Sequence, residues 1–62
     1  MPTITIDGPP IADTAIKREL VRDITDAAEK AYGIPREAYV VLIREYTPEN
    51  VGIGGVLLFD RR

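Results

Sequence analysis

The five consecutive apolar residues at positions 39–43, YVVLI, constrain the fold more than any other feature of the sequence. They do not alternate with polar residues, which is the pattern of a β-strand covered on both faces. A chain of 62 residues with one evident amphipathic helix can cover only one of these faces. We therefore expect a second copy of the chain to cover the other face.

A strand and a helix precede this apolar segment. Residues 3–7, TITID, alternate polar and β-branched apolar side chains, as a half-buried strand does. Asp13 or Thr14 can then cap a helix, and Gly33 is placed to end it near Tyr32. Apolar residues recur at three- and four-residue steps in between and predict one buried helix face. These residues are Ile16, Leu20, Ile24, Ala27, Ala28 and Ala31.

The second half of the chain predicts a longer strand, a loop and a short tail. Residues 38–46 contain the apolar segment, residues 47–55 have the Pro, Asn and Gly content of a loop, and residues 56–59 resemble a short strand. Two strands joined by a helix form a β-α-β unit with parallel strands and a right-handed connection. We therefore predict a single α/β (α+β) domain over residues 1–62, whose C-terminal strand also needs a partner.

The composition excludes several classes of protein. The chain has no cysteine and no histidine, so disulfides and the common metal sites are excluded, and oligomerisation is the expected support for so small a domain. A net charge of -2 without a dense Lys/Arg cluster argues against nucleic acid as a partner. A ribbon-helix-helix DNA-binding protein is also a poor fit, because it needs a basic strand and two helices, whereas TITID has no positive charge and only one helix is evident. No apolar run reaches the roughly 18 residues of a membrane span and no signal peptide is evident, so we expect a cytoplasmic protein.

Two further motifs have structural explanations. Gly52, Gly54 and Gly55 suggest a phosphate loop, but no helix follows them, as phosphate-binding motifs require. A tight turn into the tail explains them better. The acidic residues are scattered along a helix face and a loop, which gives no support for a catalytic carboxylate pair or an oxygen-ligand metal site.

Pro2 has two interpretations. A proline lacks the N–H that a strand ladder uses, so it fits at the first position of a strand. If Met1 is removed, Pro2 instead becomes a secondary amine, which is a base and nucleophile that a proline within the chain cannot supply. The local sequence leaves both interpretations open.

Several short motifs together point to one family. The chain starts with Met-Pro, continues through a strand and a helix to a Gly-X-Pro step and an apolar strand, and then reads NVGIGG. In these features and in its length it resembles the 4-oxalocrotonate tautomerase family, over the whole chain. The matching positions are Pro2, Pro35, Gly52, Ile53, Gly54, Gly55, Arg61 and Arg62.

The resemblance implies an isomerase that assembles as a hexamer, a trimer of dimers. In this family the initiator methionine is removed, and the nitrogen of the exposed proline, here Pro2, is the base that moves a proton between carbons through an enol. No metal or cofactor takes part. Desolvation at an apolar strand start favours the neutral amine. Ile4, Val51 and Ile53 are candidates for the dry wall around it.

The resemblance breaks down at the positions that bind substrate. The better-known members carry two arginines that grip the substrate's carboxylates, and those positions hold Ala12 and Val40 here. The active-site aromatic residue of the family falls at Val51. Losing a preorganised charge of this kind costs about 3 kcal/mol of transition-state stabilisation, so other cations must replace it or the substrate must be less anionic.

Three cations are candidates for this replacement, namely Lys17, Arg18 and Arg36. Arg36 is the first choice because the start of the second strand should lie beside Pro2. Solvated surface charge is the alternative for each of the three. Val40 is a further candidate for substrate binding, although its apolar side chain is better suited to packing.

The leading hypothesis is therefore a cofactor-free enol–keto tautomerase that acts on a small 2-oxo or 2-hydroxydienoate acid. The same proline would also serve a hydratase, a dehalogenase or a decarboxylase, as in larger relatives of the family. A non-catalytic oligomeric binding protein is the alternative from a different class, in which Pro2 merely starts the strand.

Overall fold

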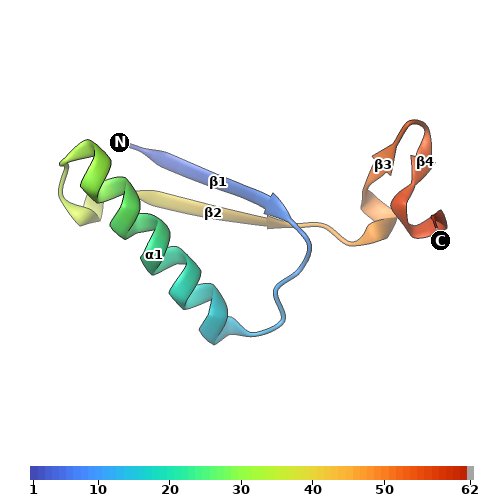
Figure 1. Ribbon diagram of the computed structural model, residues 1–62, viewed down its shortest axis with the longest axis horizontal. Helices are drawn as coiled ribbons and strands as arrows, with labels where there is room; N and C mark the ends of the chain where they lie inside the picture. Colours follow the sequence, from blue (N-terminus) through green and yellow to red (C-terminus); the bar gives the residue numbers. More distant parts are fainter. Residues whose placement is uncertain (62) are drawn as a thin grey trace.

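The computed structural model describes residues 1–61 as one β-α-β unit followed by a small C-terminal hairpin (Figure 1). Strand β1 (Thr3–Gly8) leads into helix α1 (Thr14–Tyr32), which returns the chain to strand β2 (Val40–Glu45). The two strands pair in parallel along their whole length. The predicted fold class is confirmed. Arg62, one of the residues that carry the resemblance, lies outside the described part of the chain.

Helix α1 begins and ends where the sequence predicts. The Asp13 carboxylate accepts a hydrogen bond from the Ala15 N–H at 2.9 Å, which caps the first turn. At the other end Gly33 adopts the left-handed conformation (φ 71°), and its N–H donates to the Glu29 carbonyl. A side chain would be strained at this φ, so glycine is the residue that ends the helix.

The helix covers one face of the two-stranded sheet and leaves the other open. The half-buried residues of the covered face are Ile4, Ile6, Val41 and Ile43. Glu45, further along the same face of β2, reaches Lys17 of α1. Leu42 on the opposite face is 45% exposed. Within one chain, the prediction that a single helix covers only one side of the apolar strand is therefore confirmed.

The covered face of α1 differs from the apolar stripe that the sequence predicts, because Thr25 is buried while Ile16, Ala27 and Ala31 are exposed. Thr25 is the one buried residue among residues 1–61, and its hydroxyl donates to the Val21 carbonyl at 2.8 Å. This bond satisfies the hydroxyl within the helix, so a polar residue can occupy the packed face. Ile16, at the start of the predicted stripe, is instead 53% exposed.

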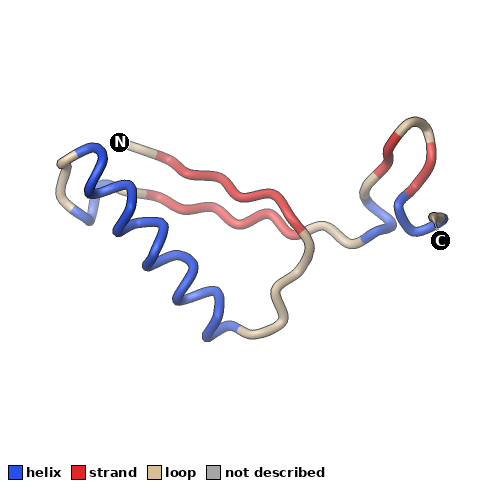
Figure 2. The backbone as a smooth tube through the Cα atoms, viewed as in Figure 1, coloured by secondary structure: helices blue, strands red, loops and turns tan. Residues whose placement is uncertain are grey.

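The C-terminal hairpin extends away from the β-α-β unit (Figure 2). Strands β3 (Gly52–Ile53) and β4 (Val56–Leu57) pair antiparallel around Gly54 and Gly55, which both have positive φ. The prediction of a strand over residues 56–59 is therefore too long. The strand stops after Leu57 because β3 offers only two residues to pair with.

Short 3₁₀ turns occupy three connections. They are η1 (Arg36–Ala38), η2 (Pro48–Asn50) and η3 (Leu58–Asp60). The second strand begins at Val40 rather than at residue 38, because η1 includes Ala38 and Tyr39 follows as its C-cap, with its N–H bonded to the Arg36 carbonyl. The predicted loop after β2 contains η2 and the short strand β3.

The chain exposes more surface than a compact monomer of its mass. Its accessible surface is 4864 Å², against about 4000 Å² expected from the scaling for monomeric proteins. Its radius of gyration is 15.1 Å, against about 10.6 Å expected for a compact chain of this length. No hydrophobic residue within residues 1–61 is buried. These values support the expectation that further copies cover the chain.

Glu45 ties the end of β2 to the segment around the start of α1. Its carboxylate accepts a hydrogen bond from the Ile11 N–H at 2.8 Å and pairs with Lys17 Nζ at 2.9 Å, and these contacts lower the pKa of Glu45. A carboxylate whose pKa is lowered on folding stabilises the fold above its unfolded-state pKa, and the contribution disappears as the pH falls through the folded-state pKa. We therefore expect E45Q to lower the stability modestly at neutral pH and not in strong acid.

Urea unfolding at a series of pH values, from strongly acidic to neutral, measures this difference. E19Q is the matched control, because Glu19 also lies near the start of α1 but makes no ion pair within residues 1–61. A loss of stability in E45Q that is equal at every pH would contradict the assignment.

Candidate active site

Pro2 lies at one end of the β1–β2 pair. Its carbonyl accepts a hydrogen bond from the Val40 N–H at 3.0 Å, at the start of the parallel ladder. Continuing the register by one residue places Pro2 opposite Tyr39, the residue that precedes β2. Pro2 is half-buried. The structure therefore brings together Pro2 and Val40, two of the residues that the sequence singles out.

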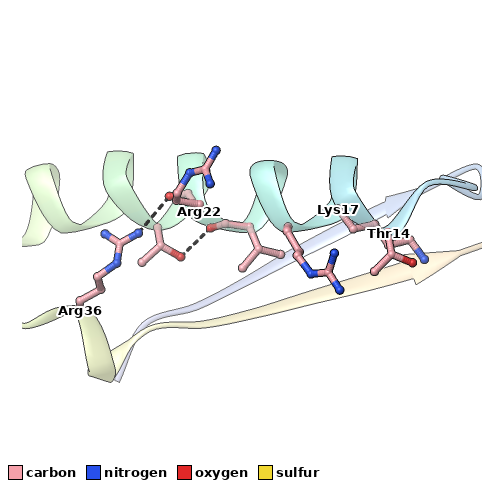
Figure 3. Close-up of a pocket in the computed structure, with 7 residues that line it drawn as sticks. Thr14, Lys17, Arg22 and Arg36 are labelled. Atoms are coloured by element: carbon pink, nitrogen blue, oxygen red, sulfur yellow. Dashed lines mark hydrogen bonds between the residues drawn. The ribbon is translucent and has the colours of Figure 1, made fainter.

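The three candidate cations line a single groove along α1, with a volume of about 440 Å³. Figure 3 shows Arg36 at one end of this groove and Thr14 and Lys17 at the other. The lining residues are Thr14, Lys17, Arg18, Val21, Arg22, Thr25 and Arg36. Sequence reasoning missed Arg22 as a member of this set. Its spacing of four residues from Arg18 places both on one helix face and could have identified it.

Lys17 and Arg36 are already paired with carboxylates. Lys17 Nζ lies 2.9 Å from Glu45 Oε2. Arg36 Nη1 lies 2.6 Å from Asp26 Oδ1 and 3.1 Å from Glu29 Oε1, and the hydrogen bond to Asp26 is the main cause that raises the pKa of Arg36 above its ordinary value. Both cations are therefore held by partners within their own chain.

Arg18 differs from these two cations in its contacts. Its side chain is exposed, and it makes no ion pair with a carboxylate of residues 1–61. Among the described residues, Arg18 is therefore the groove cation without a carboxylate partner, and a guanidinium of this kind can donate two parallel hydrogen bonds to a carboxylate.

Val51 and Ile53 lie away from Pro2. Val51 lines a second groove of about 310 Å³, and Ile53 on β3 is 50% exposed. The other residues of this groove are Gly8, Pro9, Pro10, Tyr46, Pro48 and Leu58. Figure 1 shows the N-terminus at one end of the sheet and the hairpin beyond the other end. One chain therefore does not bring Pro2 and the NVGIGG segment together.

The described residues contain no group of three or more acidic, histidine or cysteine side chains that could hold a metal ion. None of their helices is both long enough and apolar enough to cross a membrane.

The comparisons with known proteins agree on one family. The family model described as "Tautomerase enzyme" matches residues 2–61. Among curated proteins, "Probable tautomerase SAV1363" of Staphylococcus aureus (strain Mu50 / ATCC 700699) is 41% identical over 44 residues, which cover 71% of this chain and 72% of the relative.

Solved structures show the same relationship over nearly the full length. A 4-oxalocrotonate tautomerase homologue (TTHB242) has a TM-score of 0.85 and 31% identity, and the match covers 100% of this chain and 98% of the homologue. DmpI from Archaeoglobus fulgidus has a TM-score of 0.80 and 42% identity, with 95% and 100% covered. A heterohexamer 4-oxalocrotonate tautomerase from Chloroflexus aurantiacus J-10-fl has a TM-score of 0.81 and 27% identity, with both chains fully covered. The chain thus belongs to the tautomerase family and has the fold of the 4-oxalocrotonate tautomerase homologues.

Proposed function

We propose that the protein is a cofactor-free enol–keto tautomerase for a small 2-oxo or 2-hydroxydienoate acid, with the nitrogen of Pro2 as the base after Met1 is removed. The observation that carries the proposal is the placement of Pro2 in a chain of this family. Its carbonyl is anchored by the Val40 N–H, while the preceding Met1 is 89% exposed. An aminopeptidase can therefore reach Met1, and the proline that it leaves behind stays attached to the sheet.

The proposed reaction is a proton transfer in which atoms and electrons balance. The neutral amine of Pro2 takes the proton of the enol hydroxyl, and the electron pair of that O–H bond becomes part of the new C=O bond. The carbon at the end of the enol or dienol then accepts the proton from the Pro2 ammonium group. The amine is regenerated, and no oxidant or cofactor is consumed.

The proposed site needs apolar cover over the amine. Burial disfavours the charged form of an amine, which lowers its pKa toward the working pH and makes it an effective base. In one chain Val51 and Ile53 lie away from Pro2, so we propose that a neighbouring copy supplies them. The excess surface of the single chain supports assembly, and the heterohexameric relative supports a hexamer as the form to test first.

The experiment that tests the function starts from protein whose intact mass shows the loss of one methionine. Such protein should ketonise the enol of phenylpyruvate or a 2-hydroxydienoate acid, followed by the change in ultraviolet absorbance. If neither compound reacts faster with the protein than in buffer, the proposed function is wrong. Products of water addition or decarboxylation would point instead to the related reactions of the same amine.

Arg18 is expected to bind the carboxylate of the substrate. Arg18→Ala should raise KM about tenfold for a carboxylated enol, since a hydrogen bond to a charged group contributes about 1.5 kcal/mol or more. Lys17→Ala should have a smaller effect, because Lys17 is paired with Glu45. Steady-state kinetics on both variants provide the measurement.

Lys30→Ala is the matched control for the cation variants, because Lys30 lies on the same helix and does not line the groove. If Lys17→Ala and Arg18→Ala both keep the wild-type KM, neither cation binds the substrate, and Arg36, backbone amides or a bound water must do so instead.

A further inference from the structure

The side chain of Arg36 joins the connection after α1 to the body of the helix. Its guanidinium reaches three points on α1, namely Asp26 at 2.6 Å, Glu29 at 3.1 Å and the Arg22 carbonyl at 3.3 Å. Figure 3 shows the last of these contacts as the dashed line beside Arg36. Because the contacts come from two nitrogens of a rigid planar group, they fix the direction of the side chain.

The local charge argues against a role for Arg36 in binding an anionic substrate. Two carboxylates face one guanidinium, so the cluster of Asp26, Glu29 and Arg36 carries a net charge of about −1 at neutral pH. A substrate carboxylate would be repelled by this cluster and would have to displace one of its members. The guanidinium therefore serves contacts within its own chain.

A series of backbone hydrogen bonds leads from Arg36 to Pro2. The Arg36 carbonyl accepts a hydrogen bond from the Tyr39 N–H at 3.3 Å, and the N–H of the next residue, Val40, donates to the Pro2 carbonyl at 3.0 Å. The Tyr39 hydroxyl donates to the Ile34 carbonyl at 2.9 Å and accepts from the Ile34 N–H at 3.3 Å. The connection between α1 and β2 is thus cross-linked, and Arg36 attaches it to the helix.

We propose that Arg36 is a positioning residue for Pro2, held by Asp26 and Glu29 so that the Val40 N–H stays in place against the Pro2 carbonyl. This inference rests on the proposed role of the Pro2 nitrogen as base. The ring holds the nitrogen of Pro2 rigidly on Cα, and only the torsion ψ separates it from the carbonyl, so anchoring the carbonyl restricts where the nitrogen can lie. A general base must lie within hydrogen-bond reach of its proton, and a displacement of about 1 Å can cost about 100-fold in rate.

The first test is the kinetics of Arg36→Ala. We expect kcat to fall by about 10- to 100-fold while KM changes by less than about twofold, because the base is misplaced and substrate contacts are retained. Arg36→Lys should recover part of kcat, since lysine keeps the charge facing the carboxylates but cannot make the same set of contacts. A rise in KM with kcat unchanged would overturn the proposal and return Arg36 to substrate binding.

The double variant Asp26→Asn/Glu29→Gln separates the two roles by the direction of its effect. If Arg36 positions Pro2, releasing it from the helix lowers kcat, as Arg36→Ala does. If Arg36 binds substrate, freeing its charge lowers KM for a carboxylated enol, and the proposal fails. Glu19→Gln/Asp23→Asn is the matched control, because it also removes two negative charges from α1. Among the ion pairs of residues 1–61, these two residues take part only in the contact of Asp23 with Arg22, at 3.9 Å.

Hydrogen exchange tests the proposal without any turnover. The Val40 amide should exchange at least about tenfold faster in Arg36→Ala than in the wild type, while amides in the middle of β2 keep their rates. Unchanged exchange at Val40 would overturn the proposal even if the variant lost activity. If the wild type did not ketonise any enol, the proposed function would fail, and faster exchange would still establish the link between Arg36 and Val40.

Discussion

Replacing Pro2 with alanine is expected to lower kcat for enol ketonisation by about 10²- to 10⁴-fold, the range that general acid–base catalysis contributes. The variant keeps a free amine after methionine removal, but this amine is primary, more hydrated and free to rotate. It is therefore a poorer base in this position. Ultraviolet assays give the rates, and sedimentation shows whether the oligomer is unaltered, as we expect.

A short N-terminal extension tests the same nitrogen more severely. With Met1 and a few further residues retained, the nitrogen of Pro2 is part of an amide and has no useful basicity. The anchored Pro2 carbonyl is unaffected by this change, so the start of the β1–β2 ladder should remain. If the extended protein assembles and still ketonises enols at the original rate, Pro2 is a structural residue and the proposed mechanism is wrong.

Local signals in the sequence predicted the helix and its ends. Asp13 caps the first turn and Gly33 takes the left-handed conformation, because both effects depend only on neighbouring residues. The run of apolar residues in β2 likewise predicted a strand with one face left open by a single helix. Leu42 on that open face is 45% exposed.

The lengths of the C-terminal elements could not be predicted in this way. A strand extends only as far as its partner allows, and β4 pairs with just the two residues of β3. The apolar residues 58 and 59 continue the strand pattern, but the chain turns into η3 there. The amino-acid composition of a segment indicates that it prefers the strand conformation, but it does not indicate whether a second strand is present to pair with it.

Three residues of the groove along α1 could be identified from the sequence, but their contacts could not. The sequence identified Lys17, Arg18 and Arg36, and the structure places all three in one groove. The sequence did not indicate that Arg36 is held by Asp26 and Glu29, which lie ten and seven residues earlier, on α1. Those ion pairs form because the connection after the helix folds back along it.

The distance along the molecule between Pro2 and the hairpin leads to a prediction about mixed oligomers. Pro2→Ala removes the base, and Val51→Asp places a charge in the proposed apolar wall, so we expect each variant alone to be nearly inactive. If each site combines Pro2 of one copy with Val51 of another, random mixing of equal amounts after unfolding leaves about a quarter of the sites with both residues intact. The mixture should therefore recover about a quarter of the wild-type rate.

Sedimentation supplies the control for this experiment, because the wild type and both parents must form the same oligomer. A folded wild-type monomer at micromolar concentration would contradict the shared site outright. If Val51→Asp fails to assemble, Ile53→Asp replaces it, since Ile53 is half exposed in the single chain and its substitution disturbs less packing.

Mass spectrometry of the intact complexes verifies that hybrids have formed. Verified hybrids without activity would mean that Pro2 and the hairpin do not share a site, and the wall around the amine would have to come from residues near β1 and β2 of the same chain.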